Sequence, residues 1–394
     1  MVGQNILCIA PHPWDDICRR RHHLMTRFAR TNRVLWIEPP QFILFYFLPQ
    51  FRKSVRKGVL FKVRRNLLVY RLFNPLPFGE SFLRRGIGWV YKFNECCCVF
   101  QVKMVMTHLK FVRPILWLFA INFSEKLVGK CNEIITIFDV FDKYSAFSCF
   151  DDWEAKWIED REKKIMRRVT LIFAVSEQLC AYSRQFNKNV FLVPNGVDIT
   201  LWQKHSRKKV PVLNLKLNHP VLGYVGSIFD KVDLDLLLRV SGAYPQMSLL
   251  LIGPVKVLNS LNQKLLSQLQ SQLNVYFVKP KFYGDLPFYY EIIDISLLPY
   301  APTEQVKYAQ FPTKLFEYMA ARKPILAMDT FNLKDFEEIV WIAYSKEKFV
   351  QSIGQILRED TRARVQRGYE MACQNSWDIR VKQIEDIIES YLSK

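Results

Sequence analysis

The chain reads FPTKLFEYMAARKPILA over residues 311–327. Pro312 and Thr313 are signals for the start of a helix, and strong helix formers follow them. Pro324 stops the helix because its ring cannot continue the hydrogen-bond pattern. The apolar residues 325–327 then indicate a buried strand. The segment therefore predicts a loop, a short helix and a strand, which is the repeating unit of an α/β fold.

One face of this short helix carries a cation and a carboxylate. Lys314 and Glu317 are three positions apart, so they project side by side. A lysine in the first turn opposes the helix dipole, which favours anions there. A helix N-terminus with an added lysine suits a phosphate or diphosphate, and a nearby carboxylate suits sugar hydroxyls. Taken alone, the segment is equally compatible with an amphipathic helix whose two charges are simply solvated.

Alternating strands and helices extend this pattern over both halves of the chain. The first half contains apolar strands at 5–10, 34–38, 134–138, 171–175 and 190–193, and helices at 20–30 and 153–168. The second half contains strands at 220–226, 248–253, 275–278 and 295–298, and helices at 233–241, 263–273, 286–292 and 378–392. Such alternation predicts parallel, doubly wound sheets. We expect two Rossmann-like domains that face each other across a cleft, with a basic linker at 204–218.

Length and composition agree with two domains. A chain of 394 residues is too long for one ordinary core, and half of its residues are hydrophobic. The nine cysteines are odd in number and form no CxxC pair, which favours thiols in a reducing compartment. No histidine spacing suits zinc, so no metal site is expected. No signal peptide or apolar window of roughly 18–20 residues is present. We expect a cytoplasmic protein that is not integral to a membrane.

The charge is concentrated in the first half. Residues 1–200 hold 31 Lys and Arg against 17 Asp and Glu. Segment 42–71 begins with an apolar aromatic run, contains no acidic residue and carries eight basic ones: Arg52, Lys53, Arg56, Lys57, Lys62, Arg64, Arg65 and Arg71. This composition predicts a peripheral contact with an anionic membrane, here its inner face. Nucleic-acid binding would also explain the basic residues, but it would leave the exposure of the aromatic run unexplained. In a third interpretation, that run is a buried strand and only the basic loop is exposed.

Several motifs in order resemble the GT-B glycosyltransferases of the large "group 1" family. The stretch 191–198, FLVPNGVD, resembles the family's interdomain hinge. Other stretches resemble its glycine loop, later strand ends, donor-binding helix and C-terminal helix: 222–228, 251–254, 297–300, 314–324 and 377–392. A narrower resemblance, to enzymes of teichuronic-acid and other surface-polysaccharide synthesis, rests on WDDICRRRHH at 14–23 and on Asp139 with Asp142.

The resemblance implies two facing Rossmann-like domains with a C-terminal helix that crosses back to the first. Residues 1–200 and helix 378–394 would form the acceptor-side domain, and residues 205–377 the donor domain. The implied reaction moves a sugar from a nucleotide diphosphate donor to a lipid-linked saccharide acceptor, with retention of configuration. Neither a cofactor nor a metal is expected, because side chains can meet the charge of the diphosphate. Nucleic acid is not an expected partner.

The resemblance also implies roles for residues of the donor domain. Lys314 would stabilise the negative charge of the leaving diphosphate, and Glu317 would hold the ribose hydroxyls. The remaining donor-binding candidates are Gly226, Ser227, Lys231, Thr313 and Tyr308. Two positions depart from the family pattern. Ala309 replaces the first of two usual glutamates, and Arg322 replaces a glycine, so we expect it to adopt a conformation that glycine finds easier.

Acceptor-side candidates follow the first strand and a middle strand. Doubly wound sheets bind ligands at the carboxyl ends of their strands. Arg20 or Arg21 would meet a phosphate, and Asp16 or His22 would orient an acceptor hydroxyl. Asp142 is a candidate base, and Trp14 and Asp15 complete the set. The alternative for each residue is an ordinary structural role at a helix start or in a loop.

Two other classes of protein remain open. A nucleotide-sugar epimerase can share this architecture, although no epimerase signature is present. A non-catalytic basic protein that binds membrane or nucleic acid would explain the charge alone, and would show salt-dependent binding without affinity for nucleotide sugars.

Overall fold

The chain forms two compact units, each built around its own sheet. The computed structural model describes residues 1–44, 58–77, 88–147, 150–204, 215–257, 259–303, 306, 308, 313–330 and 333–393. The first unit comprises Met1–Phe141, Lys156–Val193 and Val381–Lys394, and the second comprises Asp142–Ala155 and Pro194–Arg380. The expected linker lies mostly outside the described residues, which omit 205–214.

The first unit contains an eight-stranded sheet in the order β3-β4-β2-β1-β5-β6-β7-β8. Its strands are β1 (Asn5–Ile9), β2 (Arg33–Phe42), β3 (Leu60–Arg64), β4 (Leu67–Asn74), β5 (Ile115–Leu118), β6 (Ile135–Val140), β7 (Leu171–Ala174) and β8 (Val190–Leu192). The strands pair in parallel except β3, which is antiparallel to β4. β1 lies between β2 and β5, so the strand order reverses there. Such a switch point is where open α/β sheets bind ligands.

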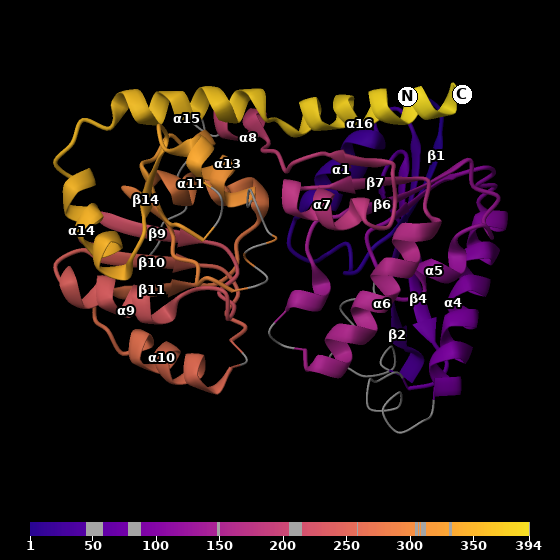
Figure 1. Ribbon diagram of the computed structural model, residues 1–394, viewed down its shortest axis with the longest axis horizontal. Helices are drawn as coiled ribbons and strands as arrows, with labels where there is room; N and C mark the ends of the chain where they lie inside the picture. Colours follow the sequence, from indigo (N-terminus) through magenta and orange to yellow (C-terminus); the bar gives the residue numbers. More distant parts are fainter. Residues whose placement is uncertain are drawn as a thin grey trace. The chain divides into compact units, whose positions relative to one another are not determined.

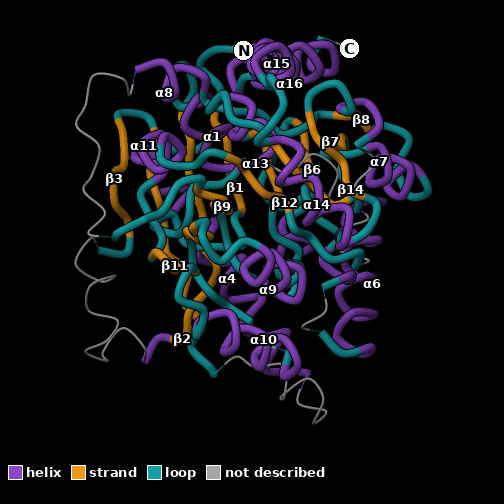
Figure 2. The backbone as a smooth tube through the Cα atoms, turned by 90° about the vertical axis from the view of Figure 1, so that its left-hand side faces the viewer, coloured by secondary structure: helices purple, strands orange, loops and turns teal. Residues whose placement is uncertain are grey.

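Helices lie on both faces of this sheet, as Figures 1 and 2 show. They are α1 (Arg20–Phe28), α4 (Gly88–His108), α5 (Ser124–Leu127), α6 (Asp152–Arg168) and α7 (Glu177–Arg184). The central strands β1, β5, β6 and β7 are almost wholly buried because helices cover them on both sides, which is why they read as continuous apolar runs. Trp36, Trp117 and Phe173 are among the largest strand side chains of this core. No helix among the described residues is long and apolar enough to span a membrane.

The second unit contains a six-stranded parallel sheet in the order β11-β10-β9-β12-β13-β14. Its strands are β9 (Val221–Val225), β10 (Ser248–Ile252), β11 (Val275–Val278), β12 (Ile295–Leu298), β13 (Ile325–Met328) and β14 (Val340–Ala343). Its helices are α8 (Ile199–Lys204), α9 (Leu234–Ala243), α10 (Ser260–Gln270), α11 (Leu286–Glu291), α13 (Thr313–Ala320), α14 (Lys346–Ile356) and α15 (Arg362–Gln374). The order reverses at β9 and β12, which makes their carboxyl ends the ligand-binding position of this sheet.

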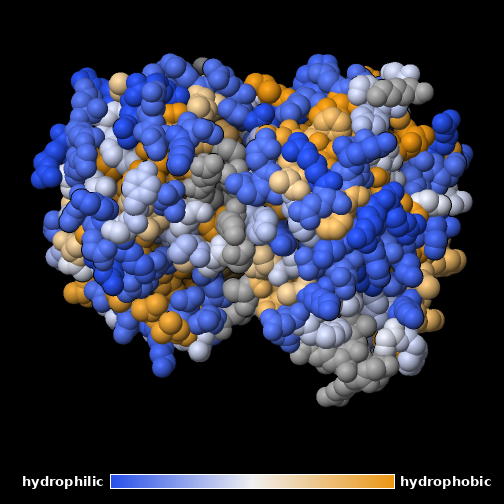
Figure 3. All heavy atoms as spheres, viewed as in Figure 1, coloured by the Kyte–Doolittle hydropathy of each residue, from blue (hydrophilic) through white to orange (hydrophobic). Residues whose placement is uncertain are grey.

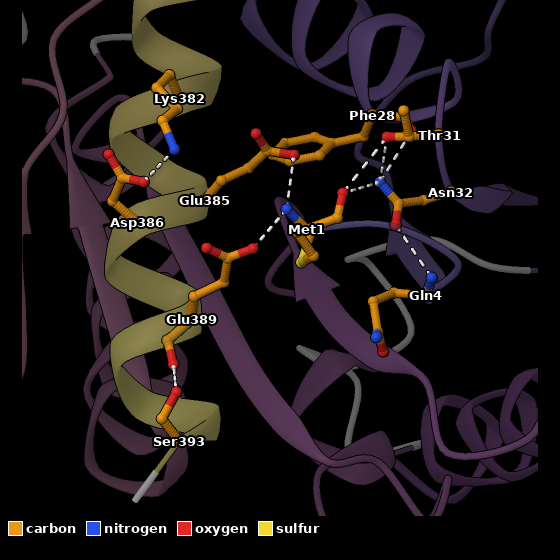
Figure 4. Close-up of polar contacts among 10 residues, drawn as sticks. All are labelled: Met1, Gln4, Phe28, Thr31, Asn32, Lys382, Glu385, Asp386, Glu389 and Ser393. Atoms are coloured by element: carbon orange, nitrogen blue, oxygen red, sulfur yellow. Dashed lines mark hydrogen bonds and ion pairs between the residues drawn. The ribbon is translucent and has the colours of Figure 1, made fainter.

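The last helix, α16 (Trp377–Leu392), is divided between the units. Its first turn belongs to the second unit, where the Trp377 amide donates to the Val197 carbonyl at 3.0 Å. Its later turns belong to the first unit and carry two carboxylates that meet the Met1 amino group, Glu389 at 2.5 Å and Glu385 at 3.6 Å (Figure 4). These carboxylates, Glu389 foremost, raise the pKa of the Met1 amino group. The predicted α/β class, with two Rossmann-like parallel sheets, is confirmed.

Candidate functional site

The side chain of Lys314 lies over the glycine that ends β9. Gly226 has a φ of +151°, and a Cβ atom built on it would collide with the Cε and Nζ atoms of Lys314. The amide of Gly226 donates to the Ile252 carbonyl at 2.7 Å, so the turn is fixed to the neighbouring strand. The structure thus brings together two predicted donor residues that are 88 positions apart in the sequence. The absence of a side chain at Gly226 is what leaves room for the lysine.

Tyr318 fastens helix α13 to the switch point of the sheet. Its hydroxyl accepts a hydrogen bond from the Val225 amide at 3.3 Å and donates one to the Leu297 carbonyl at 3.1 Å. Those two partners stand at or near the ends of β9 and β12. The start of α13, with Thr313 and Lys314 half-buried, is thereby held where a doubly wound sheet binds ligands.

Two lysines flank a pair of buried tyrosines beside this turn. The Lys314 Nζ atom lies 5.8 Å from the centre of the Tyr224 ring, and the Lys231 Nζ atom lies 5.3 Å from that of Tyr300. The two rings are 6.2 Å apart, edge to face. Burial alone would raise the pKa of Tyr300, but the charges of Lys314 and Lys231 outweigh it and lower that pKa. The local potential is therefore positive, which suits an anion.

Glu317 is buried rather than solvated. Only 7% of the residue is exposed, and the Tyr290 hydroxyl donates to its Oε2 atom at 3.5 Å. Burial raises the pKa of Glu317, and the nearby charge of Lys314 opposes that rise. A helix with two solvated charges is therefore the wrong interpretation of this segment. A buried carboxylate beside a cation is the kind of group that orients hydroxyls.

Two of the other donor-side candidates, Ser227 and Tyr308, make contacts of their own. The Ser227 carbonyl accepts from the Tyr224 hydroxyl at 2.9 Å, which shapes the turn after Gly226. The Tyr308 hydroxyl and ring contact Lys143, whose Nζ atom is 3.4 Å from the hydroxyl oxygen and 4.4 Å from the ring centre. Lys143 was not singled out from the sequence. Ala309 lies outside the described residues.

Arg322 adopts the conformation expected of the glycine that it replaces. Its φ is +55°, a left-handed value that is unusual for a side chain with a Cβ atom. Its guanidinium lies 3.8 Å from the centre of the Tyr369 ring. This cation–π contact offsets part of the roughly 1–2 kcal/mol that a non-glycine residue loses in this region. The prediction for Arg322 is confirmed.

On the first unit, Arg20 is engaged in an internal ion pair. Its Nε atom donates to Asp139 Oδ1 at 2.8 Å, a second guanidinium nitrogen lies 3.3 Å from Oδ2, and both residues are buried. Burial raises the pKa of Asp139, and Arg20 opposes that rise. Arg21 is also buried, with its guanidinium 5.9 Å from the centre of the Phe141 ring. A phosphate would have to displace the Asp139 carboxylate to reach Arg20.

His22 caps its own helix. Its Nδ1 atom accepts from the Arg19 amide at 3.1 Å, and its Nε2 atom donates to the Trp14 carbonyl at 3.2 Å. Its ring packs 5.0 Å from those of both Trp14 and Trp36. Burial lowers the pKa of His22 to about 4, and the charge of Arg21 adds to this effect. A catalytic role would require His22 to give up one of these hydrogen bonds.

Glu38 and Arg71 connect Trp14 and Asp15, and sequence reasoning missed both Glu38 and the burial of Arg71. Glu38 accepts from the Trp14 amide at 2.8 Å and from Arg71 Nε at 2.9 Å. Arg71 also lies 3.5 Å from Asp15 Oδ2. Burial raises the pKa of Glu38, and its hydrogen bond from Trp14 and the charge of Arg71 oppose this. A lone arginine inside the apolar strand LLVYRLFN was the available signal for a buried pair.

Placing Arg71 in the membrane-facing basic segment was therefore wrong. Arg71 is 5% exposed and its charge is met by Glu38. Lys62, Arg64 and Arg65 are exposed on or beside β3. Residues 45–57 of the segment, which include most of the aromatic run and the other basic residues, lie outside the described residues.

The last two acceptor-side candidates lie near the surface. Asp16 forms an ion pair with Arg19 at 3.6 Å. Burial favours a higher pKa for Asp16, but a hydrogen bond from the Ile17 amide and the charge of Arg19 lower it. Asp142 is half-buried in the segment Asp142–Ala155, which groups with the second unit. Among the described residues, no group of three or more His, Cys, Asp or Glu side chains is arranged to hold a metal ion.

Comparisons with known proteins agree on one family. Residues 206–369 match the family model "Glycosyl transferases group 1". The chain is 28% identical over 346 residues to a putative teichuronic acid biosynthesis glycosyltransferase, TuaH, of Bacillus subtilis, covering 81% of this chain and 79% of the relative.

Solved structures show the same fold over nearly the whole chain. Sucrose-phosphate synthase from Thermosynechococcus elongatus has a TM-score of 0.74 at 18% identity, covering 99% of each chain. HepE from Anabaena, solved in complex with UDP-glucose, has a TM-score of 0.67 at 13% identity, covering 98% of this chain and 100% of that one. The fold is that of the GT-B glycosyltransferases, and the chain is similar to the group 1 glycosyl transferases over residues 206–369, which supports a transferase enzyme.

Proposed function

We propose that the second unit binds a nucleotide diphosphate sugar and that the enzyme transfers its sugar to a lipid-linked saccharide in surface-polysaccharide synthesis, with retention of configuration. The observation that carries the donor site is the position of Lys314 over Gly226, beside the buried carboxylate of Glu317. The cation suits the phosphates of such a donor, and the turn without a side chain lets the backbone approach them closely. The carboxylate suits the hydroxyls of the donor.

The proposed catalytic contribution of Lys314 is electrostatic. As the glycosidic bond breaks, the leaving diphosphate gains negative charge, and a fixed cation stabilises the transition state more than the ground state. Lys231 and the start of α13 add to the same positive region. Removal of one such group typically costs about 100- to 1,000-fold in rate.

We assign Glu317 to the ribose of the donor. Burial removes water from the Glu317 carboxylate and so raises its pKa. A ribose hydroxyl that donates a hydrogen bond to this carboxylate would therefore stabilise its charged form. Tyr290 already donates to Oε2 and holds the carboxylate in place. Gly226 and Ser227 would approach the phosphates through their backbone, and Thr313, Tyr308 and Lys231 would complete the donor site.

The acceptor assignment rests on a relative and on the first unit. The Bacillus subtilis relative is named for teichuronic acid biosynthesis, which supports a surface saccharide as acceptor. Trp14, Asp15 and Asp16 follow β1 at the switch point of the first sheet, which supports an acceptor site there. The contacts of Arg20 and His22 support a positioning role for both. Asp142 remains our candidate for the group that orients the acceptor.

Two substitutions in α13 test the donor site. Lys314→Ala should lower kcat by about 100-fold or more while the melting temperature changes little. Glu317→Gln should weaken donor binding by about tenfold, because the amide is a poorer acceptor for ribose hydroxyls. The matched controls are Lys334→Ala and Glu337→Gln, both exposed positions of the same unit.

Binding and product analysis separate this proposal from its alternatives. A panel of nucleotide sugars, UDP-glucose among them, is screened by thermal shift, since a bound donor raises stability by mass action. Sugar transfer is then followed with the donor that binds. Wild-type turnover in the Lys314→Ala enzyme, or an epimerised donor without any acceptor, would refute the assignment.

A further inference from the structure

We infer that helix α4 is a membrane-docking helix that lies flat on an anionic lipid surface. The inference rests on the exposed face of α4 and not on the transferase activity. Four large apolar side chains of the helix are exposed: Trp89 at 63%, Phe93 at 47%, Phe100 at 68% and Met104 at 49%. Together with the exposed Cys96, they define what we call the α4 stripe.

The spacing of the α4 stripe places it on one side of the helix. Its members follow one another at intervals of four, three, four and four residues, the repeat of a single helical face. From the first to the last member, the stripe runs about 22 Å along the helix axis. The edge of the first unit along which α4 runs in Figure 1 shows hydrophobic side chains among hydrophilic ones in Figure 3. Contiguous exposed apolar surface of this extent marks a site of protein or membrane contact.

The opposite face of α4 is fixed to the sheet, so the stripe cannot turn inward. The buried Gln101 side chain donates to the Phe73 carbonyl at 2.8 Å and accepts from the Phe73 amide at 3.2 Å. Asn94 makes the same pair of contacts with Leu76, donating to the carbonyl at 3.1 Å and accepting from the amide at 3.4 Å. These paired amide contacts hold the helix in one rotation about its axis.

The charges around the stripe select the partner. Lys92 and Lys103 are exposed at its border, and the single acidic residue of α4, Glu95, is buried and ion-paired with Arg161 at 2.8 Å. The exposed face of α4 is therefore apolar and basic. Two copies of such a face would bring like charges together, whereas anionic head groups would meet the lysines while the aromatic residues enter the interface. A lipid surface fits both features at once.

Vesicle flotation with the full chain tests this inference. The vesicles are phosphatidylcholine with or without a third of phosphatidylglycerol. Wild-type protein should float with the anionic vesicles and much less with the neutral ones. Phe93→Ser/Phe100→Ser and Lys92→Glu/Lys103→Glu should each weaken the binding by about tenfold or more. Melting temperatures verify that each variant is folded.

Matched controls come from exposed positions of the second unit. Leu261→Ser/Leu273→Ser removes two apolar side chains, and Lys264→Glu/Lys348→Glu makes the same change of charge. Both controls should bind vesicles like the wild type. Donor binding, measured by thermal shift, should be unchanged in the α4 variants, which keeps this test independent of the proposed function.

Three outcomes would overturn the inference. One is a wild-type protein that does not float with anionic vesicles, and another is α4 variants that float as well as it does. The third is a dimeric wild-type protein whose stripe variant is monomeric in solution but floats as well as the wild type. That result would show that the α4 stripe contacts a second copy of the chain.

Discussion

At the scale of single residues, the turn at Gly226 is the most demanding position of the donor site. Alanine there would place a Cβ atom in the path of Lys314 and would hold a φ of +151° that only glycine adopts readily. We expect Gly226→Ala to reduce sugar transfer by about 100-fold or more, through displacement of the lysine, and to destabilise the protein by about 1–3 kcal/mol. Gly284→Ala is the matched control, since a Cβ atom there meets nothing within 4 Å. Equal activity of the two variants would contradict the arrangement.

His22 makes the stability of the first unit sensitive to acid. Its pKa is about 4 in the folded state and about 6.5 when unfolded, so the unfolded chain binds more protons between these values. The neutral ring therefore contributes stability above pH 6.5 that is lost as the pH falls toward 4, at most about 3 kcal/mol. Urea unfolding at pH 7 and pH 4.5 measures this loss, which should shrink in His22→Gln. The exposed His108→Gln should keep the wild-type loss; equal losses in all three proteins would argue against the assignment.

The proximity of site residues was predictable from the sequence where the partners were close in the chain. Lys314 and Glu317 share one helix, so their proximity follows from helical spacing. Arg20 and Asp139 are 119 positions apart, and Glu38 and Arg71 are 33 apart. Only the folded sheet brings such pairs together, so the sequence could suggest surface roles for these arginines but not their burial.

At the scale of elements, helix α13 depends on one hydroxyl for its attachment to the sheet. Tyr318→Phe keeps the ring but removes the hydrogen bonds to Val225 and Leu297. Because the Val225 amide and Leu297 carbonyl would lose that hydroxyl as a partner, we expect a loss of about 1–3 kcal/mol. Urea denaturation measures it. Tyr344→Phe, at an exposed position, should change the free energy of unfolding by less than about 0.5 kcal/mol. A Tyr318→Phe protein as stable as the wild type would show that packing alone holds α13.

Two of the elements that sequence reasoning missed, α4 and β4, have no clear hydrophobic period. Helix α4 is apolar on both its buried and its exposed face, so its pattern does not alternate as that of an ordinary surface helix does. Strand β4 carries a buried arginine within its apolar run. By contrast, α6 and β9 have the expected patterns, and both were predicted close to their observed bounds, Asp152–Arg168 and Val221–Val225.

At the scale of the whole molecule, the alternation of strands and helices was enough to predict two parallel sheets. It could not predict the order β3-β4-β2 at one edge of the first sheet, because β3 pairs antiparallel with β4 through a local hairpin outside the repeating pattern. The alternation also could not predict the unit to which Asp142–Ala155 belongs, because this segment follows a strand of the first unit but groups with the second unit. Contacts between distant parts of the chain decide both features.

The charge of the whole donor site bears on its need for metal. Lys314 and Lys231 both lie beside the turn after β9 and lower the pKa of Tyr300. We propose that these cations neutralise the diphosphate without a divalent ion. The rate of sugar transfer should therefore fall by less than about twofold when EDTA is added. Removal of a catalytic metal would cause a far larger loss, because such a metal contributes several kcal/mol to transition-state stabilisation. A loss of activity that magnesium or manganese restores would show the opposite.

The contact between Gly226 and Lys314 also means that the two positions cannot vary independently. Part of the harm done by a side chain at position 226 comes from the lysine that it meets, and part from the backbone angle itself. In a double-mutant cycle, Gly226→Ala should destabilise the Lys314→Ala background less than the wild type, a positive epistasis in stability that brings no recovery of catalysis. The destabilisation caused by a substitution at position 226 therefore depends on the residue at position 314, and it is larger when that residue is lysine.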